Sequence, residues 1–150
     1  MRALIQRVSS ARVIIEGEVA GEIGKGLCVF LGVAPEDGED EVKWIAEKTA
    51  NLRIFEDGSG KMNLSLLETG GSMLVVSQFT LYGDCRRGRR PSFAGACEPV
   101  RANDLYEKFK SEVSKLGVRV ESGRFQAYML VDIRNDGPVT LLVDTDGGQR

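Results

Sequence analysis

The sequence predicts a single α+β domain over residues 1–150, in which a largely antiparallel or mixed β-sheet curls into a barrel-like form beside two main helices. Three observations lead to this fold class. Most of the chain consists of short apolar runs punctuated by glycines, which is typical of strands and turns. Only two segments have the apolar spacing of an amphipathic helix, and they do not alternate regularly with the strands. No linker, repeat or low-complexity tract divides the chain.

The first part of the chain is predicted to form strands and then a helix. Glycines such as Gly17 and Gly24 separate its apolar runs and act as turn residues or bulges. The acidic run Glu36–Glu41 suits the positive N-terminal end of a helix. The predicted strands are Ala3–Val8, Arg12–Glu16, Glu18–Ile23 and Leu27–Val33, and the predicted helix runs from about Asp40 to Arg53.

The rest of the chain contains further strands and one long amphipathic segment. Leu105, Phe109 and Val113 lie on one stripe of a helix that Gly117 ends. The expected elements are a short ordered piece at Met62–Leu67, a helix at about Val100–Leu116, and strands at Ser72–Ser77, Val118–Ser122, Ala127–Ile133 and Val139–Asp144. Residues 145–150 are expected to fray.

Composition limits the partners that the protein can have. The residues are 42% hydrophobic and 28% charged, with a formal net charge of −2, so a nucleic acid would have to bind to a local basic patch. No apolar run approaches the roughly 18–20 residues that cross a membrane. Met1–Arg7 lacks the apolar core of a signal peptide, so we expect a cytoplasmic protein with no membrane partner.

The absence of histidine excludes several kinds of active site. The Ser-His and Cys-His nucleophilic systems and the HExxH zinc motif all require it. Cys28 lies in an apolar run and is predicted to be a core residue, whereas Cys85 and Cys97 lie in a polar stretch without CxxC spacing. We therefore expect no metal site. Any chemistry must come from carboxylates, lysine, main-chain groups or the substrate itself.

Ser77–Leu81 is a polar interruption at the end of a predicted buried strand and is a candidate catalytic segment. Strand alternation would place Ser77 and Phe79 on one face. Gln78 and Thr80 would then lie on the other. Without a base neither hydroxyl is an activated nucleophile, but N–H groups that leave the ladder at a strand end can form an oxyanion hole. The alternative, that these residues simply end the strand, stays open.

A second polar segment, Asn135–Thr140, separates two apolar runs. Pro138 cannot donate to a strand ladder and therefore belongs at an edge, a bulge or a turn. The bond between Gly137 and Pro138 can be cis, because a tertiary amide prefers trans by only roughly 0.5–1 kcal/mol. Such an arrangement would turn main-chain carbonyls toward a ligand. The simpler alternative is a tight turn between two strands.

Arginines mark two further candidate sites. Arg86, Arg87, Arg89 and Arg90 lie in a loop with glycine and proline. Their guanidinium groups suit the phosphates of a nucleic acid, although a solvated loop or pairing with acidic neighbours is the alternative. Arg7 stands in an apolar strand, where it either braces a site by binding carbonyls or a carboxylate, or lies exposed on an edge strand.

Taken together, these segments resemble the D-aminoacyl-tRNA deacylases, once called D-tyrosyl-tRNA deacylases, over nearly the whole chain. Each signature alone is weak, but their joint occurrence in this order is highly specific. The segments that carry the resemblance are Ile5–Ser9, Gly17–Val19, Gly21–Gly24, Leu52–Phe55, Gly60–Leu64, Val75–Leu81, Gly88–Phe93 and Asn135–Thr140.

The resemblance implies a homodimer that hydrolyses the ester between a D-amino acid, or glycine, and the terminal adenosine of tRNA, with no metal or organic cofactor. Gly137 and Pro138 would be joined by a cis bond and would enter the partner's active site, so that the active sites lie at the subunit interface. Their carbonyls would hold the substrate's α-amino group, and the rigid main chain would reject an L side chain.

The resemblance also implies roles for individual residues. In the catalytic segment, which includes Ser77, main-chain groups around Phe79 and Thr80 would position the ester, with Thr80 at the scissile bond and the terminal 2′-hydroxyl assisting. Gln78 would orient the adenosine or the ester. The supporting residues would be Arg7, which braces the Gly-Pro segment, together with Met129 and Asn135, while Arg86, Arg87, Arg89 and Arg90 would meet tRNA phosphates.

Three positions depart from the usual family pattern: Gln126, Tyr128 and Arg134. They put in question the outer wall of the pocket and any transferred substrate preference. Two rival functions also stay open. One is a related proofreader that removes a mischarged small L-amino acid, using a trans Gly-Pro. The other is a non-catalytic tRNA-binding module that uses the arginine loop.

Overall fold

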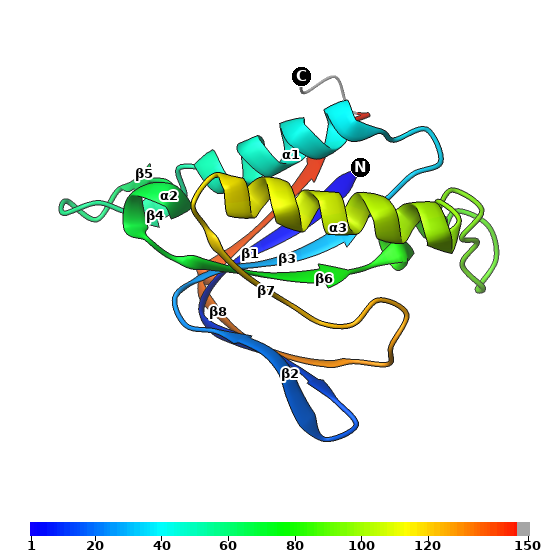
Figure 1. The fold of residues 1–150 in the computed structure, drawn as a ribbon, viewed down its shortest axis with the longest axis horizontal. Coiled ribbons are helices and arrows are strands. Elements are labelled where there is room, and N and C mark those ends of the chain that lie inside the picture. Colours follow the sequence, from blue (N-terminus) through cyan, green and yellow to red (C-terminus); the bar gives the residue numbers. More distant parts are fainter. Residues whose placement is uncertain (147–150) are drawn as a thin grey trace.

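The structure, a computed structural model, describes residues 1–146; the rest of the predicted frayed tail, residues 147–150, lies outside the described part. A nearly closed, barrel-like mixed sheet carries its long helices along one side (Figure 1). The predicted α+β class is therefore confirmed, with a short helix and a 3₁₀ turn added. The elements are β1 (Arg2–Ile15), β2 (Glu18–Ile23), β3 (Gly26–Gly32), α1 (Glu39–Asn51), β4 (Phe55–Glu56), β5 (Met62–Leu64), α2 (Leu66–Thr69), β6 (Ser72–Ser77), η1 (Phe79–Tyr82), α3 (Pro99–Lys115), β7 (Arg119–Ser122) and β8 (Leu130–Asp144).

The sheet follows the order β2-β1-β3-β6-β7, and β8 pairs with β1 beside this path. Strand β1 is antiparallel to β2, β3 and β8, whereas β3–β6 and β6–β7 are parallel pairs. The two ends of the path approach each other at Gly21 on β2, where an added Cβ would lie 2.6 Å from the carbonyl oxygen of Ser122 on β7. The sheet thus curls until its ends nearly meet.

Two strands are longer than predicted. The predicted strands Ala3–Val8 and Arg12–Glu16 form one strand, β1, except that Glu16 lies in the turn after it; β1 pairs with β3 in its first half and with β2 in its second. Likewise β8 runs through Asn135–Thr140, so the alternative prediction of a tight turn between two strands is wrong. Its pairing with β1 is irregular there, and Pro138 lies in a strand that pairs on one side only. Alternation patterns do not show that a strand continues through such an irregularity.

The long helices begin at residues that satisfy their first N–H groups. In α1, the N–H of Gly38 donates to the Glu41 carboxylate at 2.9 Å. In α3, the carboxylate of Glu98 accepts from the N–H groups of Val100 and Arg101, and proline occupies the first helical position. Within residues 1–146, no helix has both the length and the apolar character that crossing a membrane requires.

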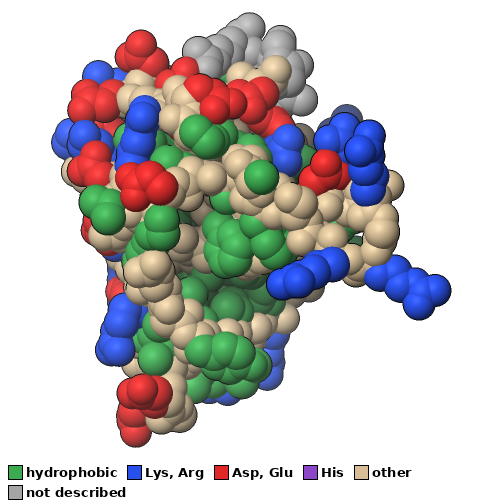
Figure 2. Space-filling view, turned by 90° about the vertical axis from the view of Figure 1, so that its right-hand side faces the viewer, with side chains coloured by type: hydrophobic (Ala, Val, Ile, Leu, Met, Phe, Trp, Pro, Cys, Tyr) green, Lys and Arg blue, Asp and Glu red, His purple; other side chains and the backbone are tan. Residues whose placement is uncertain are grey.

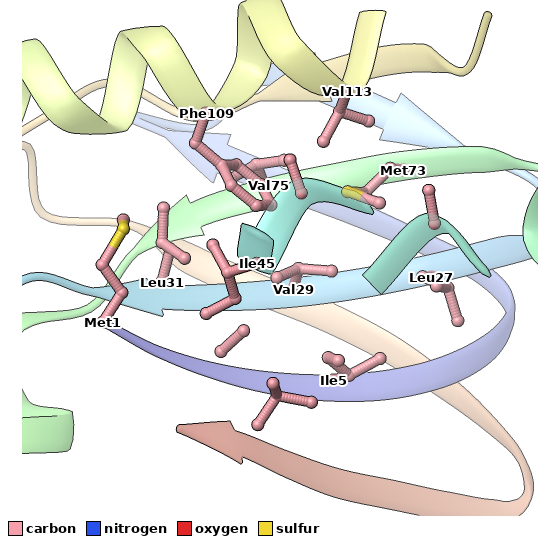
Figure 3. Close-up of a cluster of buried hydrophobic side chains, with 14 of the residues drawn as sticks. Met1, Ile5, Leu27, Val29, Leu31, Ile45, Met73, Val75, Phe109 and Val113 are labelled. Carbon is pink, nitrogen blue, oxygen red and sulfur yellow. The ribbon is translucent and has the colours of Figure 1, made fainter. Parts of the chain in front are cut away.

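Two apolar clusters lie on opposite faces of the sheet, and this explains the apolar runs of β3 and β6. Leu27 and Val29 on β3 and Val75 on β6 point toward the helices, among the side chains drawn in Figure 3. Cys28 and Leu74 belong to the cluster on the other face. Strands that are buried on both sides have no polar face, so they are continuously apolar. Cys28 is buried as predicted, and burial raises the pKa of its thiol to about 12.

The predicted fraying does not begin at Thr145. Its N–H donates to the carbonyl of Met1 at 3.0 Å, and its exposed fraction is only 4%. The α-ammonium of Met1 donates to the Thr145 hydroxyl and forms a buried ion pair with Asp37 at 2.6 Å. A charge that is removed from water requires such partners, so these contacts hold the end of β8 against the start of β1.

Candidate active site

A cavity of about 690 Å³ opens where β6 ends, between the segment that leads into α3 and the segment that precedes β8. Its floor is apolar and buried and includes Leu31, Val76 and Cys97. Its rim is exposed and includes Phe79, Phe93 and Gln126. Figure 2 shows the corresponding face of the molecule, with hydrophobic side chains gathered in its middle and Lys and Arg side chains projecting at its border.

Ser77, Gln78 and Phe79 all line this cavity. The strand ends at Ser77 as predicted, but the chain then turns into the 3₁₀ helix η1, so the predicted alternation of faces is wrong beyond this residue. Phe79 and Thr80 open η1, and the first N–H groups of a helix have no partner within it. No backbone acceptor outside the helix takes these two N–H groups in residues 1–146.

Thr80 does not line the cavity itself but is coupled to a residue that does. The side-chain amide of Gln78 donates to the Thr80 hydroxyl. The N–H of Gln78 donates to the carbonyl of Leu31 at 2.8 Å, which ties the start of η1 to β3. The structure therefore brings all four predicted catalytic residues together at one end of β6.

Arg2 holds η1 in place, a contact that we did not predict. Its Nη1 donates to the carbonyl of Leu81 at 2.9 Å, and its guanidinium lies 4.5 Å from the centre of the Tyr82 ring. Its Nε donates to Asp144 at 2.8 Å. The only sign of this role in the sequence is that Arg2 stands at the start of an apolar run. Burial, and then the nearby carboxylates, raise the pKa of Tyr82, so its hydroxyl stays protonated.

Gly137 and Pro138 are exposed, and neither lines the cavity of its own chain. The peptide bond between them is cis. The Asn135 side chain spans the segment, because its Oδ1 accepts from the N–H of Val139 at 2.8 Å and its Nδ2 donates to the Thr140 hydroxyl at 3.0 Å. The predicted polar segment is therefore an ordered, exposed projection of β8.

Arg7 is buried beneath this projection, so the alternative of an exposed Arg7 is wrong. Its Nε donates to the carbonyl of Asp136 at 2.9 Å, and its Nη1 donates to the carbonyl of Ile54 at 2.6 Å. Of the other residues singled out from the sequence, Met129 lines the cavity, whereas Tyr128 and Arg134 are exposed and do not.

The predicted arginine loop joins η1 to the cavity rim. A bridge between Asp84 and Ser92 closes it, and Phe93 follows directly. The guanidinium of Arg86 donates two hydrogen bonds to Asp84, at 2.9 and 2.7 Å, and holds the pKa of that carboxyl below its usual range. The other three arginines, Arg87, Arg89 and Arg90, are exposed and pair with no acidic side chain in the described part of the chain. Pairing with an acidic neighbour thus accounts for Arg86 alone.

The family model described as D-Tyr-tRNA(Tyr) deacylase matches residues 4–144. The chain belongs to this family. A D-aminoacyl-tRNA deacylase of Desulfatibacillum aliphaticivorans is 61% identical over 145 residues, which are 97% of this chain and 99% of the relative. One from Fervidobacterium nodosum is 58% identical and covers 97% of each chain. The resemblance found in the sequence is therefore confirmed.

This member of the D-Tyr-tRNA(Tyr) deacylase family also resembles a solved structure closely. The structure is titled c-Myc DNA Unwinding Element Binding Protein and has a TM-score of 0.91 at 40% identity. The match covers 97% of this chain and 99% of that one, so the whole fold is shared. Within residues 1–146, no group of three or more Cys, Asp or Glu side chains is placed to hold a metal ion.

Proposed function

We propose that the protein is a cytoplasmic D-aminoacyl-tRNA deacylase, which hydrolyses the ester between a D-amino acid, or glycine, and the 3′-terminal adenosine of tRNA and spares L-aminoacyl-tRNA. The observation that carries the proposal is the cavity lined by Ser77, Gln78 and Phe79 beside the arginine loop, in a chain of the D-Tyr-tRNA(Tyr) deacylase family. The relatives named D-aminoacyl-tRNA deacylase match over nearly their whole length.

The chemistry that we propose relies on main-chain groups and on the substrate. Water adds to the ester carbonyl, and the N–H groups of Phe79 and Thr80, which lack a backbone partner, donate to the oxygen that becomes negative. The ribose 3′-oxygen then leaves with a proton, assisted by the neighbouring 2′-hydroxyl. Gln78 orients the ester or the adenosine. The lack of histidine is consistent with this scheme, because no step needs a side-chain base.

Selection against L substrates is proposed to come from a second subunit. Gly137 and Pro138 are exposed and lie outside the cavity of their own chain, so they are free to enter the cavity of a partner. There their carbonyls would hold the α-amino group and leave no room for an L side chain. The support for this role is that Arg7 and Asn135 hold the segment in one shape.

The decisive experiment is a deacylation assay on matched D-Tyr-tRNA and L-Tyr-tRNA. We expect rapid loss of the D-amino acid and survival of the L-amino acid. Comparable hydrolysis of both would refute the assignment. Sedimentation at low protein concentration tests the second subunit, because a fully active monomer would contradict a site that borrows Gly137 and Pro138 from a partner.

A second experiment tests the source of the chemistry. Thr80→Ala should keep measurable turnover, because the main-chain N–H of residue 80 remains. D-Tyr-tRNA that ends in 2′-deoxyadenosine should be nearly inert, although it should still compete with the normal substrate for binding. Normal turnover of the deoxy substrate would show that the 2′-hydroxyl plays no part.

Two other functions are distinguished by the same assays. A proofreader of small L-amino acids would deacylate L-Ala-tRNA. A plain nucleic-acid-binding module is favoured by the unpaired arginines of the loop and by the likeness to a protein titled as binding a DNA unwinding element. Such a module would bind aminoacyl-tRNA and leave its ester intact.

A further inference from the structure

Gln126 has a backbone conformation that is unusual for a residue with a side chain. Its φ of 61° lies in the left-handed region, which L residues other than glycine rarely adopt. The N–H of Ala127 donates to the carbonyl of Arg124 at 3.2 Å, so Gln126 occupies the third position of a four-residue turn. With a positive φ, this position strongly favours glycine.

The other such residue in the described part of the chain has a simple explanation. Glu16, with a φ of 53°, is followed by Gly17 with a φ of 84°, and the two residues connect β1 to β2. Positive φ at both central residues is required in the two-residue hairpin turn that matches strand twist. Gln126 is not in a hairpin, and the turn from Arg124 to Ala127 accounts for its positive φ, at a position where glycine would be less strained.

The conformation of Gln126 places its side chain on the exposed rim of the cavity. The carboxamide makes no hydrogen bond within residues 1–146 and therefore presents a free donor and a free acceptor. Phe79 and Phe93 share the rim. Their ring centres lie 5.1 Å apart, and the rings pack edge to face. Both rings are substantially exposed, at 56% and 39%. The rim thus combines a carboxamide with aromatic surfaces.

These groups match an adenine base. A glutamine carboxamide can accept from the N6 amino group of adenine and donate to N7, and exposed aromatic rings stack on unpaired bases. Phe93 also adjoins the end of the arginine loop, so a phosphate bound by Arg89 or Arg90 would leave the next nucleotide near the rim. The cavity floor is apolar, and the carboxamide of Gln78, which also lines the cavity, already donates to the Thr80 hydroxyl.

We propose that Gln126 is a specificity-determining residue that hydrogen-bonds the N6 and N7 edge of the terminal adenine of the substrate. This inference rests on the proposed function, because it takes an aminoacyl adenosine as the ligand.

Gln126→Gly and Glu16→Gly form a matched pair that tests the proposal. Both replace a left-handed residue by glycine, so both should keep or raise the Tm. Only Gln126→Gly should weaken substrate binding. We expect its KM for D-Tyr-tRNA to rise about five- to tenfold while kcat is unchanged, because the lost hydrogen bonds are present in both the bound substrate and the transition state. Equal KM values for the wild type and Gln126→Gly would overturn the proposal.

A binding measurement identifies the base contact without turnover. The ligands are the amides of D-tyrosine with 3′-amino-3′-deoxyadenosine and with its counterpart that lacks the 6-amino group, measured by calorimetry. Wild type should bind the adenine compound about fivefold or more tightly than the other, and Gln126→Gly should bind the two equally. An unchanged preference in Gln126→Gly would refute the adenine contact. Failure of the wild type to hydrolyse D-Tyr-tRNA, by contrast, would refute the proposed function. The binding comparison of the two compounds would still test the adenine contact, because it does not depend on turnover.

Discussion

The Nε of Arg7 donates a hydrogen bond to the carbonyl of Asp136, the residue directly before Gly137, at 2.9 Å. The same guanidinium donates to the carbonyl of Ile54 at 2.6 Å, so it connects β1 to two segments far apart in the sequence. An added Cβ on Gly137 would lie 2.9 Å from Arg7 Nη2. The exposed Gly-Pro projection is therefore shaped from beneath by a buried cation.

Arg7→Met should destabilise the protein and loosen the projection. The buried carbonyl of Ile54 and the part-buried carbonyl of Asp136 lose a charged donor, which costs roughly 2–4 kcal/mol of unfolding free energy. If the projection selects chirality as proposed, the ratio of D-Tyr-tRNA to L-Tyr-tRNA hydrolysis should fall as well. Arg12→Met on the same strand is the control, because its ion pair with Asp132 is about half exposed and should be worth less than about 1 kcal/mol. Urea denaturation that gives equal losses for both variants would contradict the bracing role.

The arginine loop should bind tRNA through charge. Arg89→Ala should weaken binding of tRNA regardless of its sequence and reduce the slope of log Kd against log salt by about one. Arg119→Ala, on β7 and already paired with Glu121 at 2.8 Å, is the matched control and should leave the slope unchanged. Filter binding at several salt concentrations measures both. A slope that does not respond to Arg89 would exclude the loop from the phosphate contacts.

Closure of the sheet depends on the absence of a side chain at Gly21. Gly21→Ala would place a Cβ 2.6 Å from the main-chain oxygen of Ser122, and relieving such an overlap typically costs about 1–3 kcal/mol of unfolding free energy. Gly24→Ala is the control, since its Cβ would meet no atom within 4 Å. Thermal denaturation should show a lower Tm only for the first variant. Equal Tm values would mean that β2 and β7 separate without cost.

Asp57 should make stability depend on acid pH. Hydrogen bonds from the Ser59 hydroxyl and from the N–H groups of Lys61 and Ser59 lower its pKa to about 2. The folded pKa lies below the unfolded one, so this contribution is present above pH of about 4 and is lost as pH falls toward 2. Wild type should therefore be more stable than Asp57→Ala at pH 6, with the difference shrinking below pH 4 in urea titrations. A difference in stability that stays constant from pH 6 to below pH 4 would contradict this contribution of Asp57.

Apolar periodicity predicted the helices and strands whose formation depends mainly on the local sequence. Residues Ser72–Ser77 form a strand with the predicted bounds, and α1 and α3 differ from their predicted bounds by one or two residues, because apolar spacing and capping act locally. The continuity of β8 was missed. Pairing with β1 holds the strand together through Pro138, and such pairing is not visible in one segment of sequence.

The site was predicted only in part, for a similar reason. The motif residues Ser77 to Phe79 line the cavity, and the resemblance had already singled them out. Arg2 was missed, since its role comes from contacts with Leu81 and Tyr82, which are distant in the sequence. Cys97 looked like part of a polar loop, yet it forms part of the cavity floor because its N–H donates to the carbonyl of Val33.

The fold class, the main helices and the two polar signatures were predictable without coordinates, because they follow from local propensity, apolar spacing and residue types that stand together in the chain. Contacts between distant segments, by contrast, bury Arg7 under the Gly-Pro projection, place Gln126 at the cavity rim and bring Gly21 against Ser122. Each of these depends on pairing between segments far apart in the chain, and that pairing is set by the packing of the whole sheet.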